Sequence, residues 1–212
     1  MIKLNEIFLS IQGESSYAGW PTVFIRTSGC NLRCTYCDTT YAYYEGEKSS
    51  VEKIIATVQS HPAKHVCVTG GEPMAQPETV MLLKELCDLG YKVSLETSGS
   101  ISCAEVDRRV KKIIDVKTPD SGAAESFLSQ NLDFATDHDE FKFVICSEND
   151  FAWSEQFVAR HRLAEKFMVL YSPSFGKIEE KWLAKKILSE SSKARLQLQL
   201  HKYIWSPDTR GV

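Results

Sequence analysis

Residues 22–37 read TVFIRTSGCNLRCTYC, a β-branched run followed directly by three closely spaced cysteines. The run 22–27 predicts a strand, and Cys30, Cys34 and Cys37 follow it in a CxxxCxxC spacing that one loop can wrap around a single metal centre. Because iron–sulfur cubanes usually take four cysteine ligands, a set of three leaves one iron open to a substrate or cosubstrate. The stretch therefore predicts a [4Fe–4S] cluster at the end of a strand.

The alternatives for these three cysteines are a structural zinc site, completed by a distant His or Cys, and three unrelated core cysteines. Zinc knuckles favour two CxxC-type pairs, and the sequence has no second pair. The chain has seven cysteines, an odd number that is unlike a secreted disulfide framework. We expect the four isolated cysteines to be small buried hydrophobic residues: Cys67, Cys87, Cys103 and Cys146.

Short β-branched and aromatic runs alternate with segments of helical periodicity, which indicates βα units around a largely parallel sheet. About six core strands are fewer than the eight of a full barrel, so we expect an α/β fold, a partial and laterally open TIM-like barrel in one domain, residues 1–212. Apolar helical stripes begin at Val51, Val80 and Ile178, whereas residues 119–140 predict a loop or a poorly packed helix. The expected strands cover residues 3–9, 22–27, 65–69, 92–96, 112–117, 141–145, 167–171 and 196–199.

A second motif, Thr69-Gly70-Gly71-Glu72-Pro73, directly follows the expected strand 65–69. Its glycines let the backbone come close to a ligand, and a carboxylate with free carbonyls can receive an ammonium group. A lone Gly-Gly turn is more often structural. In parallel α/β folds, however, the carboxyl ends of the strands meet at one mouth, where this motif joins the cysteines, Thr97-Ser98-Gly99 and Lys117.

The bulk composition favours a small-molecule ligand. With 25 basic and 28 acidic residues the net charge is −3, which gives no sign of a surface for nucleic acid or an anionic membrane. The N-terminus lacks a basic region followed by a long apolar run, and no window approaches the roughly 20 apolar residues of a membrane span. We therefore expect a cytoplasmic protein.

The cysteine spacing, with the aromatic Tyr36 before the last cysteine, resembles the signature of the radical S-adenosylmethionine (SAM) superfamily, and the Gly-Gly-Glu-Pro turn resembles its segment for the methionine amine. The resemblance implies that SAM chelates the open iron through its amino and carboxylate groups. An electron from the reduced cluster then gives methionine and a 5′-deoxyadenosyl radical that abstracts hydrogen from substrate.

Four further segments, residues 7–15, 22–26, 37–39 and 197–202, are similar to the 7-carboxy-7-deazaguanine synthase family, and the similarity spans almost the whole chain. That family is a group of radical SAM lyases that convert 6-carboxy-5,6,7,8-tetrahydropterin to 7-carboxy-7-deazaguanine with loss of ammonia, on the path to queuosine. The resemblance implies hydrogen abstraction from C6 of the pterin, a Mg²⁺ requirement, a homodimer, and a flavodoxin or ferredoxin as reductant.

By resemblance, Thr39 gives its hydroxyl to Mg²⁺, a role that suits an ion which takes oxygen ligands and keeps several waters; the alternative for Thr39 is a helix or turn cap. Many relatives have Ser-Pro-Lys where this chain has residues 115–117, and Gln-Pro where it has residues 172–173. The SAM-binding residues that the resemblance implies are Asp38, Thr39, Gly70, Gly71, Glu72, Glu96, Ser98, Lys117, Ser172 and Pro173.

For the substrate, Arg26 can bind a carboxylate bidentately and Glu14 can read the amidine-like pterin edge. A surface salt bridge for Arg26, and a core or rim position for His201, are the alternatives. No residue is an obvious catalytic base. The substrate-binding residues that the resemblance implies are Gln12, Gly13, Glu14, Arg26, Thr69, His201 and the C-terminal Val212.

Two other functions remain open from the sequence. An activase that abstracts hydrogen from a glycine of a partner protein shares the cysteine spacing, but it needs a protein docking surface. A non-enzymatic iron–sulfur or zinc module needs no Gly-Gly-Glu-Pro turn.

Overall fold

A computed structural model describes residues 1–212, and its nine strands form one sheet in the order β3-β1-β2-β4-β5-β6-β7-β8-β9. From β2 onward every neighbouring pair is parallel, whereas β1 lies antiparallel to both β2 and β3. The expected partial barrel is thus confirmed, with β3 and β9 as its free edges. The strands are β1 (Ile2–Ile11), β2 (Pro21–Thr27), β3 (Glu47–Ser49), β4 (His65–Gly70), β5 (Lys92–Thr97), β6 (Lys111–Asp115), β7 (Glu140–Ile145), β8 (Met168–Pro173) and β9 (Arg195–Leu196).

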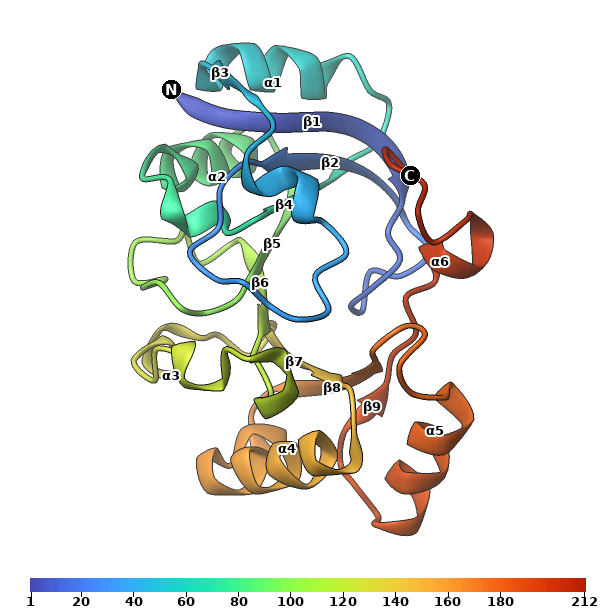
Figure 1. Cartoon of the computed structure of the whole chain (residues 1–212). Coiled ribbons are helices and arrows are strands. Elements are labelled where there is room, and N and C mark those ends of the chain that lie inside the picture. Colours follow the sequence, from blue (N-terminus) through green and yellow to red (C-terminus); the bar gives the residue numbers. More distant parts are fainter.

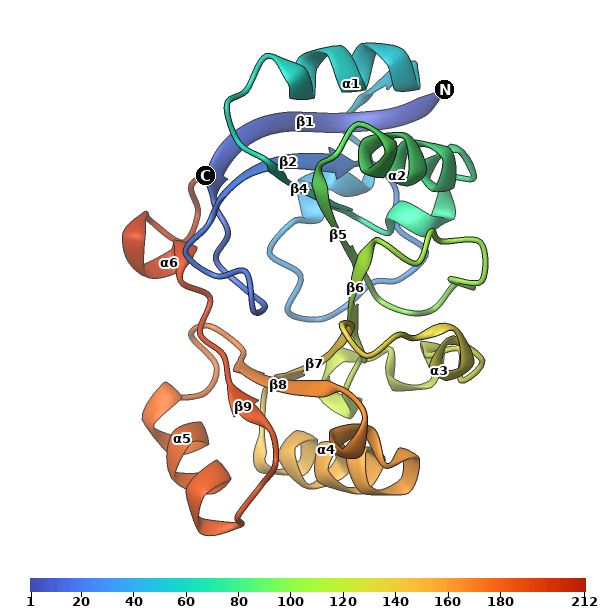
Figure 2. The same ribbon diagram turned by 180° about the vertical axis from the view of Figure 1, so that it is seen from behind.

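The sheet curves into an open arc with its main helices on the outer side, while the short α6 and the C-terminus lie at the open side (Figures 1 and 2). The helices are α1 (Val51–Gln59), α2 (Glu78–Asp88), α3 (Asn131–Phe134), α4 (Glu148–His161), α5 (Glu180–Ser189) and α6 (His201–Ile204). Short 3₁₀ turns cover Thr40–Tyr43, Pro73–Ala75, Pro119–Ser121, Ala124–Ser126 and Leu163–Glu165. None of the helices is both long and apolar enough to cross a membrane.

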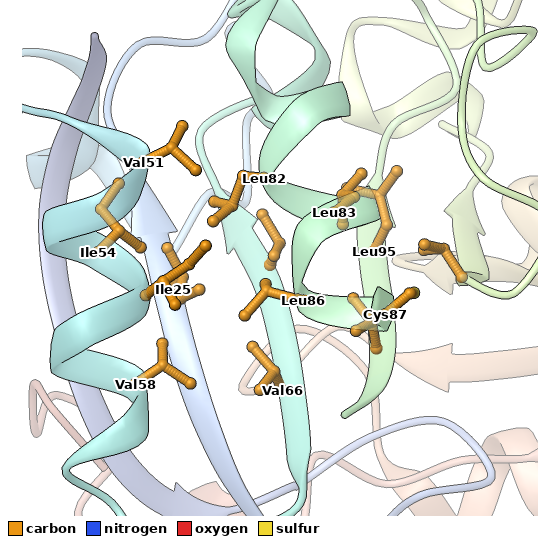
Figure 3. Packing of buried hydrophobic residues seen from close by; sticks show 14 of the residues in the cluster. Ile25, Val51, Ile54, Val58, Val66, Leu82, Leu83, Leu86, Cys87 and Leu95 are labelled. Carbon is orange, nitrogen blue, oxygen red and sulfur yellow. The ribbon is translucent and has the colours of Figure 1, made fainter. Parts of the chain in front are cut away.

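Two apolar clusters hold the helices against the outer face of the sheet. In α1, the Ser50 hydroxyl caps the helix by accepting from the Lys53 amide, and the stripe that starts at Val51 packs with α2 against β2 and β4 (Figure 3). A second cluster beneath α4 and α5 contains Phe143 and Tyr171. Each large side chain buried in this way contributes about 1.5–3 kcal/mol relative to exposure.

The period-two alternation of the strands divides each of them between these clusters and the inside of the arc. In β2, Val23 and Ile25 enter the apolar cluster, while Phe24 and Arg26 face inward to a cavity. In β7, Phe141, Phe143 and Ile145 pack outward and the residues between them face inward. The polar inner residues of the strands are therefore gathered on one concave surface.

Several expected bounds differ from the structure. β6 ends at Asp115, so Lys117 follows the strand, and β8 extends to Pro173, so that residue lies inside a strand. β9 is only two residues long and ends before most of the expected strand 196–199. Cys146 is partly exposed, unlike the other three isolated cysteines, which are buried as expected.

The sequence reading missed α4. Its inner face includes the polar residues Asp150 and Ser154, which hid the helical stripe. Asp150 is buried because its carboxylate accepts hydrogen bonds from the amides of Asp120 and Cys146, at 2.9 and 3.0 Å. Residues 119–140, expected as a loop or a poor helix, form two 3₁₀ turns and the one-turn α3.

Candidate active site

A cavity of about 460 Å³ opens inside the arc at the carboxyl ends of the parallel strands. Seventeen of the twenty site residues expected from the sequence line it, from the cysteine trio to Val212. The exceptions are Glu72, Ser172 and Pro173, all of them buried. Ser174, one residue beyond β8, lines the cavity instead.

The three thiols of the trio lie on one wall of this cavity. The Leu32 amide donates to Cys30 Sγ at 3.4 Å, and burial raises the pKa of the Cys30 and Cys34 thiols. No group of three or more His, Cys, Asp and Glu side chains is gathered as tightly as a single metal ion requires. Three thiolates are the ligand type that iron–sulfur clusters take.

The two sequence motifs are in direct contact. A side chain on Gly70, whose φ is +144°, would clash with the Thr27 backbone, and one on Gly71 would clash with the Gly29 carbonyl oxygen. In return the Gly71 amide donates to the Thr27 oxygen at 3.2 Å, and the next amide donates to the Gly29 oxygen at 2.9 Å. The glycines therefore let the turn after β4 support the start of the cysteine loop.

Glu72 has a different surrounding from the one that an ammonium-binding role requires. Its carboxylate is fully buried and accepts hydrogen bonds from Thr97 Oγ1 at 2.7 Å, Ser98 N at 2.8 Å and Ser98 Oγ at 2.6 Å. The Met74 amide donates a fourth, at 3.0 Å. These bonds join the end of β4 to the end of β5 and occupy both carboxylate oxygens.

Arg26 lines the cavity and is also ion-paired. Its Nε lies 2.8 Å from Glu6 Oε1, and its guanidinium stacks near the rings of Phe8 and Tyr41. Arg26 therefore makes a salt bridge with a side chain that is only 16% exposed and that also lines the cavity, while its contact with substrate stays a prediction.

Glu96, on β5, is a second buried carboxylate of the cavity lining. It accepts from Thr69 Oγ1 at 3.1 Å and from Gln12 Nε2 at 3.4 Å. Burial, with the neighbouring Glu14 carboxylate, raises the pKa of Glu96.

Lys142, on β7, is a cavity residue that the sequence reading missed. Its Nζ makes an ion pair with Glu14 and lies 3.4 Å from Asp115 Oδ2, while Lys117 Nζ lies 3.1 Å from Asp115 Oδ1. These side chains form an alternating row of charges, which we call the charge row: Glu14, Lys142, Asp115 and Lys117. A charge within the apolar run 141–145 was the available signal, the same kind that singled out Arg26.

Thr39 follows the last cysteine and precedes a 3₁₀ turn. Its hydroxyl makes no capping bond and donates instead to Asp38 Oδ1 at 2.9 Å. Asp38 is ion-paired with Lys202 Nζ at 2.6 Å; burial opposes ionisation, but this ammonium holds the pKa of Asp38 down to about 2. The Asp38 carboxylate and the Thr39 hydroxyl therefore place oxygen atoms side by side in the cavity lining.

His201 closes the cavity from the C-terminal side. Its ring packs against Gly13, where any side chain would clash with the imidazole, and the Leu200 amide donates to the Gly13 oxygen at 2.9 Å. Burial lowers the pKa of His201, so the ring is neutral at pH 7. Beyond it, Arg210 pairs with Glu45 at 3.0 Å, and Val212 lies at the cavity edge.

Comparison with known proteins identifies the family. The model of the Radical SAM superfamily matches residues 24–159, and this membership implies a [4Fe–4S] cluster and SAM. The crystal structure of QueE from Escherichia coli is similar with a TM-score of 0.78 and 24% identity, over 94% of each chain. The structure of SuiB from Streptococcus suis bound to S-adenosylmethionine has a TM-score of 0.52 and 12% identity, over 80% of this chain and 44% of that one.

Two curated relatives align with the whole chain. The 7-carboxy-7-deazaguanine synthase of Chlorobaculum tepidum is 45% identical over 214 residues, 100% of this chain and 97% of that protein. The enzyme of the same name from Koribacter versatilis is 42% identical over the full length of both chains. By its sequence and by its fold, this chain belongs to the 7-carboxy-7-deazaguanine synthase family of the radical SAM superfamily.

Proposed function

We propose that this protein is a radical SAM carbon–nitrogen lyase that converts 6-carboxy-5,6,7,8-tetrahydropterin to 7-carboxy-7-deazaguanine with loss of ammonia, in the biosynthesis of queuosine and other 7-deazapurines. The observation that carries the proposal is that two chemically different sets of residues line the same cavity. One wall holds three thiols and the Gly70–Gly71 turn, and the other holds charged and amide side chains suited to an anionic heterocycle. Full-length identity of 45% to a synthase of this reaction supports the same substrate.

On the cluster wall, Cys30, Cys34 and Cys37 would ligate the [4Fe–4S] cluster, and the backbone at Gly70–Gly71 would receive the SAM amine. The bound cluster and SAM supply a 5′-deoxyadenosyl radical that removes hydrogen from the substrate. The further SAM contacts would come from Asp38, Thr39, Glu96, Ser98 and Lys117. Because Glu72 lies outside the cavity lining and each of its oxygens accepts two internal hydrogen bonds, its part is to hold the β4 and β5 ends together.

On the substrate wall, Arg26 would bind the pterin carboxylate and Glu14 would accept N–H groups of the pterin edge. Gln12, Gly13 and Thr69 complete this wall, and His201, neutral at pH 7, closes it. The Val212 carboxylate at the cavity edge would meet the same ligand. Removing the last three residues should weaken pterin binding, and unchanged affinity would exclude the C-terminal contact.

We further propose that Thr39 gives an oxygen ligand to Mg²⁺, with the substrate carboxylate and waters as the other ligands. Support comes from its place in the cavity lining next to the Asp38 carboxylate, since the hydroxyl caps no helix and its oxygen can still act as a ligand. Thr39→Val should raise the Mg²⁺ concentration needed for half-maximal turnover at least tenfold. Thr40→Val is the matched control, because Thr40 is exposed and outside the cavity. Equal Mg²⁺ dependence in the two variants would remove Thr39 from the site.

The remaining expectations, one domain, a homodimer, a cytoplasmic location and a flavodoxin or ferredoxin as reductant, belong to the same proposal. The exposed Arg33, whose guanidinium donates to the Cys30 carbonyl at 2.8 Å, places a positive charge beside the cluster loop that suits an acidic electron donor. Arg33→Glu should slow turnover with flavodoxin and leave turnover with dithionite unchanged. Light scattering of the purified protein tests the dimer.

The function is tested by anaerobic reconstitution with iron and sulfide, followed by SAM, dithionite, Mg²⁺ and 6-carboxytetrahydropterin. We expect 7-carboxy-7-deazaguanine by mass spectrometry, its loss in Cys34→Ala, and its retention in Cys146→Ala, which removes a thiol outside the trio. If 5′-deoxyadenosine forms without that product, the substrate assignment fails, and a glycyl-radical activase becomes the function to test. One zinc and no sulfide would instead indicate a non-enzymatic module.

A further inference from the structure

Lys142 is a buried cation at the substrate wall, between carboxylates from two different segments. Its side chain and that of Glu14 are each 10% exposed, and the two are ion-paired although they lie 128 residues apart in the chain. Asp115, at the end of β6, is the second partner, at 3.4 Å. Lys142 therefore joins β7, β6 and the loop after β1 at the point where all three border the cavity.

Glu14 is held from several directions. Besides Lys142, Gln199 Nε2 donates to its Oε1 at 2.9 Å and Gln197 Nε2 donates to its Oε2 at 3.2 Å. Its own amide donates to Gln12 Oε1 at 3.2 Å. The carboxylate is thus fixed in one orientation at the cavity wall before any ligand arrives.

A carboxylate in such a buried place stays ionised only if a cation compensates for the loss of water. Burial alone would raise the pKa of Glu14, but the attraction and hydrogen bond of Lys142, together with His201 and the Gln199 hydrogen bond, leave it below its usual value. No other lysine or arginine touches Glu14. Lys142 is therefore the main cation that favours the ionised form of Glu14.

We propose that Lys142 is a positioning residue for substrate recognition: it keeps the Glu14 carboxylate ionised and oriented, so that Glu14 accepts the N–H donors of the pterin edge. The inference rests on the proposed function and extends it to a residue outside the set that the sequence indicated. A protonated Glu14 would present a donor where the ligand also presents donors, and an unpaired buried donor is costly. Lys142 thereby discriminates in favour of heterocycles with adjacent N–H groups.

The surrounding charges determine how a Lys142 variant responds to pH. Glu96 from β5 and Asp115 from β6 face the same ammonium, with Lys117 behind Asp115 and His201 opposite Glu14. Without Lys142, Glu14 would be left in a buried place beside Glu96, and both burial and this neighbour raise its pKa. In a variant without Lys142, this raised folded-state pKa means that Glu14 is protonated at low pH. The carboxylate becomes ionised again, and accepts hydrogen bonds, as the pH rises through that pKa.

The test is equilibrium binding of 6-carboxytetrahydropterin to the reconstituted enzyme with SAM, without reductant, from pH 6 to pH 9. We expect Lys142→Met to bind at least tenfold more weakly than the wild type at pH 6.5, equivalent to about 1.4 kcal/mol, and to recover as the pH rises. Lys142→Arg should retain most of the affinity. In the double variant Glu14→Gln/Lys142→Met the recovery with pH should be absent.

Lys112→Met is the matched control. Lys112 is equally buried and ion-paired, with Asp139 at 2.8 Å, but it lies on β6 and outside the cavity. Its loss should lower stability without changing the pH profile of pterin binding. If Lys142→Met does not fold, Lys142→Gln removes the same charge with a polar side chain and is judged by the same profile.

The inference is overturned if Lys142→Met binds pterin as Lys112→Met does at every pH, or if its loss of affinity does not depend on pH. If the wild type converts the pterin and Lys142→Met matches it, only this inference fails. If the wild type binds no pterin at all, the proposed function fails with it.

Discussion

Glu72→Gln separates a structural role of this carboxylate from a ligand-binding one. The glutamine has the same shape, but its NH₂ group replaces one of the two acceptor oxygens. If the NH₂ group replaces the oxygen that faces Ser98, it lies 2.8 Å from the Ser98 amide nitrogen, which is also a donor. The new N–H group would then stay unpaired in a fully buried place, which costs about 1–3 kcal/mol. The bonds from Thr97 and Met74 would also lose the charge of their acceptor. We therefore expect a loss of about 2–3 kcal/mol of unfolding free energy, a large share of the 5–15 kcal/mol typical of a domain.

The assay is urea unfolding monitored by circular dichroism. If the m-value is the same in both variants, a shift of the urea midpoint reports a change in stability. Glu105→Gln is the control, because it makes the same chemical change at an exposed loop residue. The reasoning would be refuted if Glu72→Gln unfolded at the same midpoint as Glu105→Gln and yet had lost SAM binding. That pattern would make the Glu72 carboxylate a ligand group, as the sequence alone suggests.

Three further predictions concern the stability of the fold. Gly71→Ala should force the segment at Gly29 away from β4, costing about 1–3 kcal/mol and lowering the iron retained after reconstitution; wild-type iron content would contradict it. Phe143→Ala removes a fully buried ring and should lower the unfolding free energy by about 3–5 kcal/mol, measured with urea. Asp107→Asn should cost about 0.5 kcal/mol at pH 6, after allowance for solvent screening, because hydrogen bonds from Arg109 lower the pKa of Asp107 to about 2. Since that folded-state pKa is depressed, the stabilisation is present above about pH 4 and should vanish as the pH falls through 2; a difference constant down to pH 2 would exclude this cause.

Local spacing made the cluster loop and the fold class predictable. Three cysteines within eight residues must lie near one another in any fold, and the β-branched run before them leads the loop to the mouth of a parallel sheet. The Gly70–Gly71 turn was recognisable for the same reason, since its conformational demand is carried by the two residues themselves. The remaining site residues came from resemblance, which supplied Thr39 and His201 where isolated residues are ambiguous.

Orientation across the sheet was outside the reach of local patterns. Whether a lysine in a strand points to the cavity or to the helices depends on the register of that strand, so Lys142 and Lys112 look alike in sequence and lie on opposite faces. The same limit applies to α4, whose buried Asp150 accepts one of its two hydrogen bonds from the distant Asp120 amide.

The sequence by itself determined most of the core strands, the cluster loop and the family, because these follow from short-range spacing and side-chain type. Only the tertiary structure decided which polar groups face one another. Glu14 pairs with Lys142, and Glu72 accepts from Ser98 and does not face the cavity. Such pairings join segments far apart in the chain, and a buried charge acquires its partner only when the strands have taken their places in the sheet.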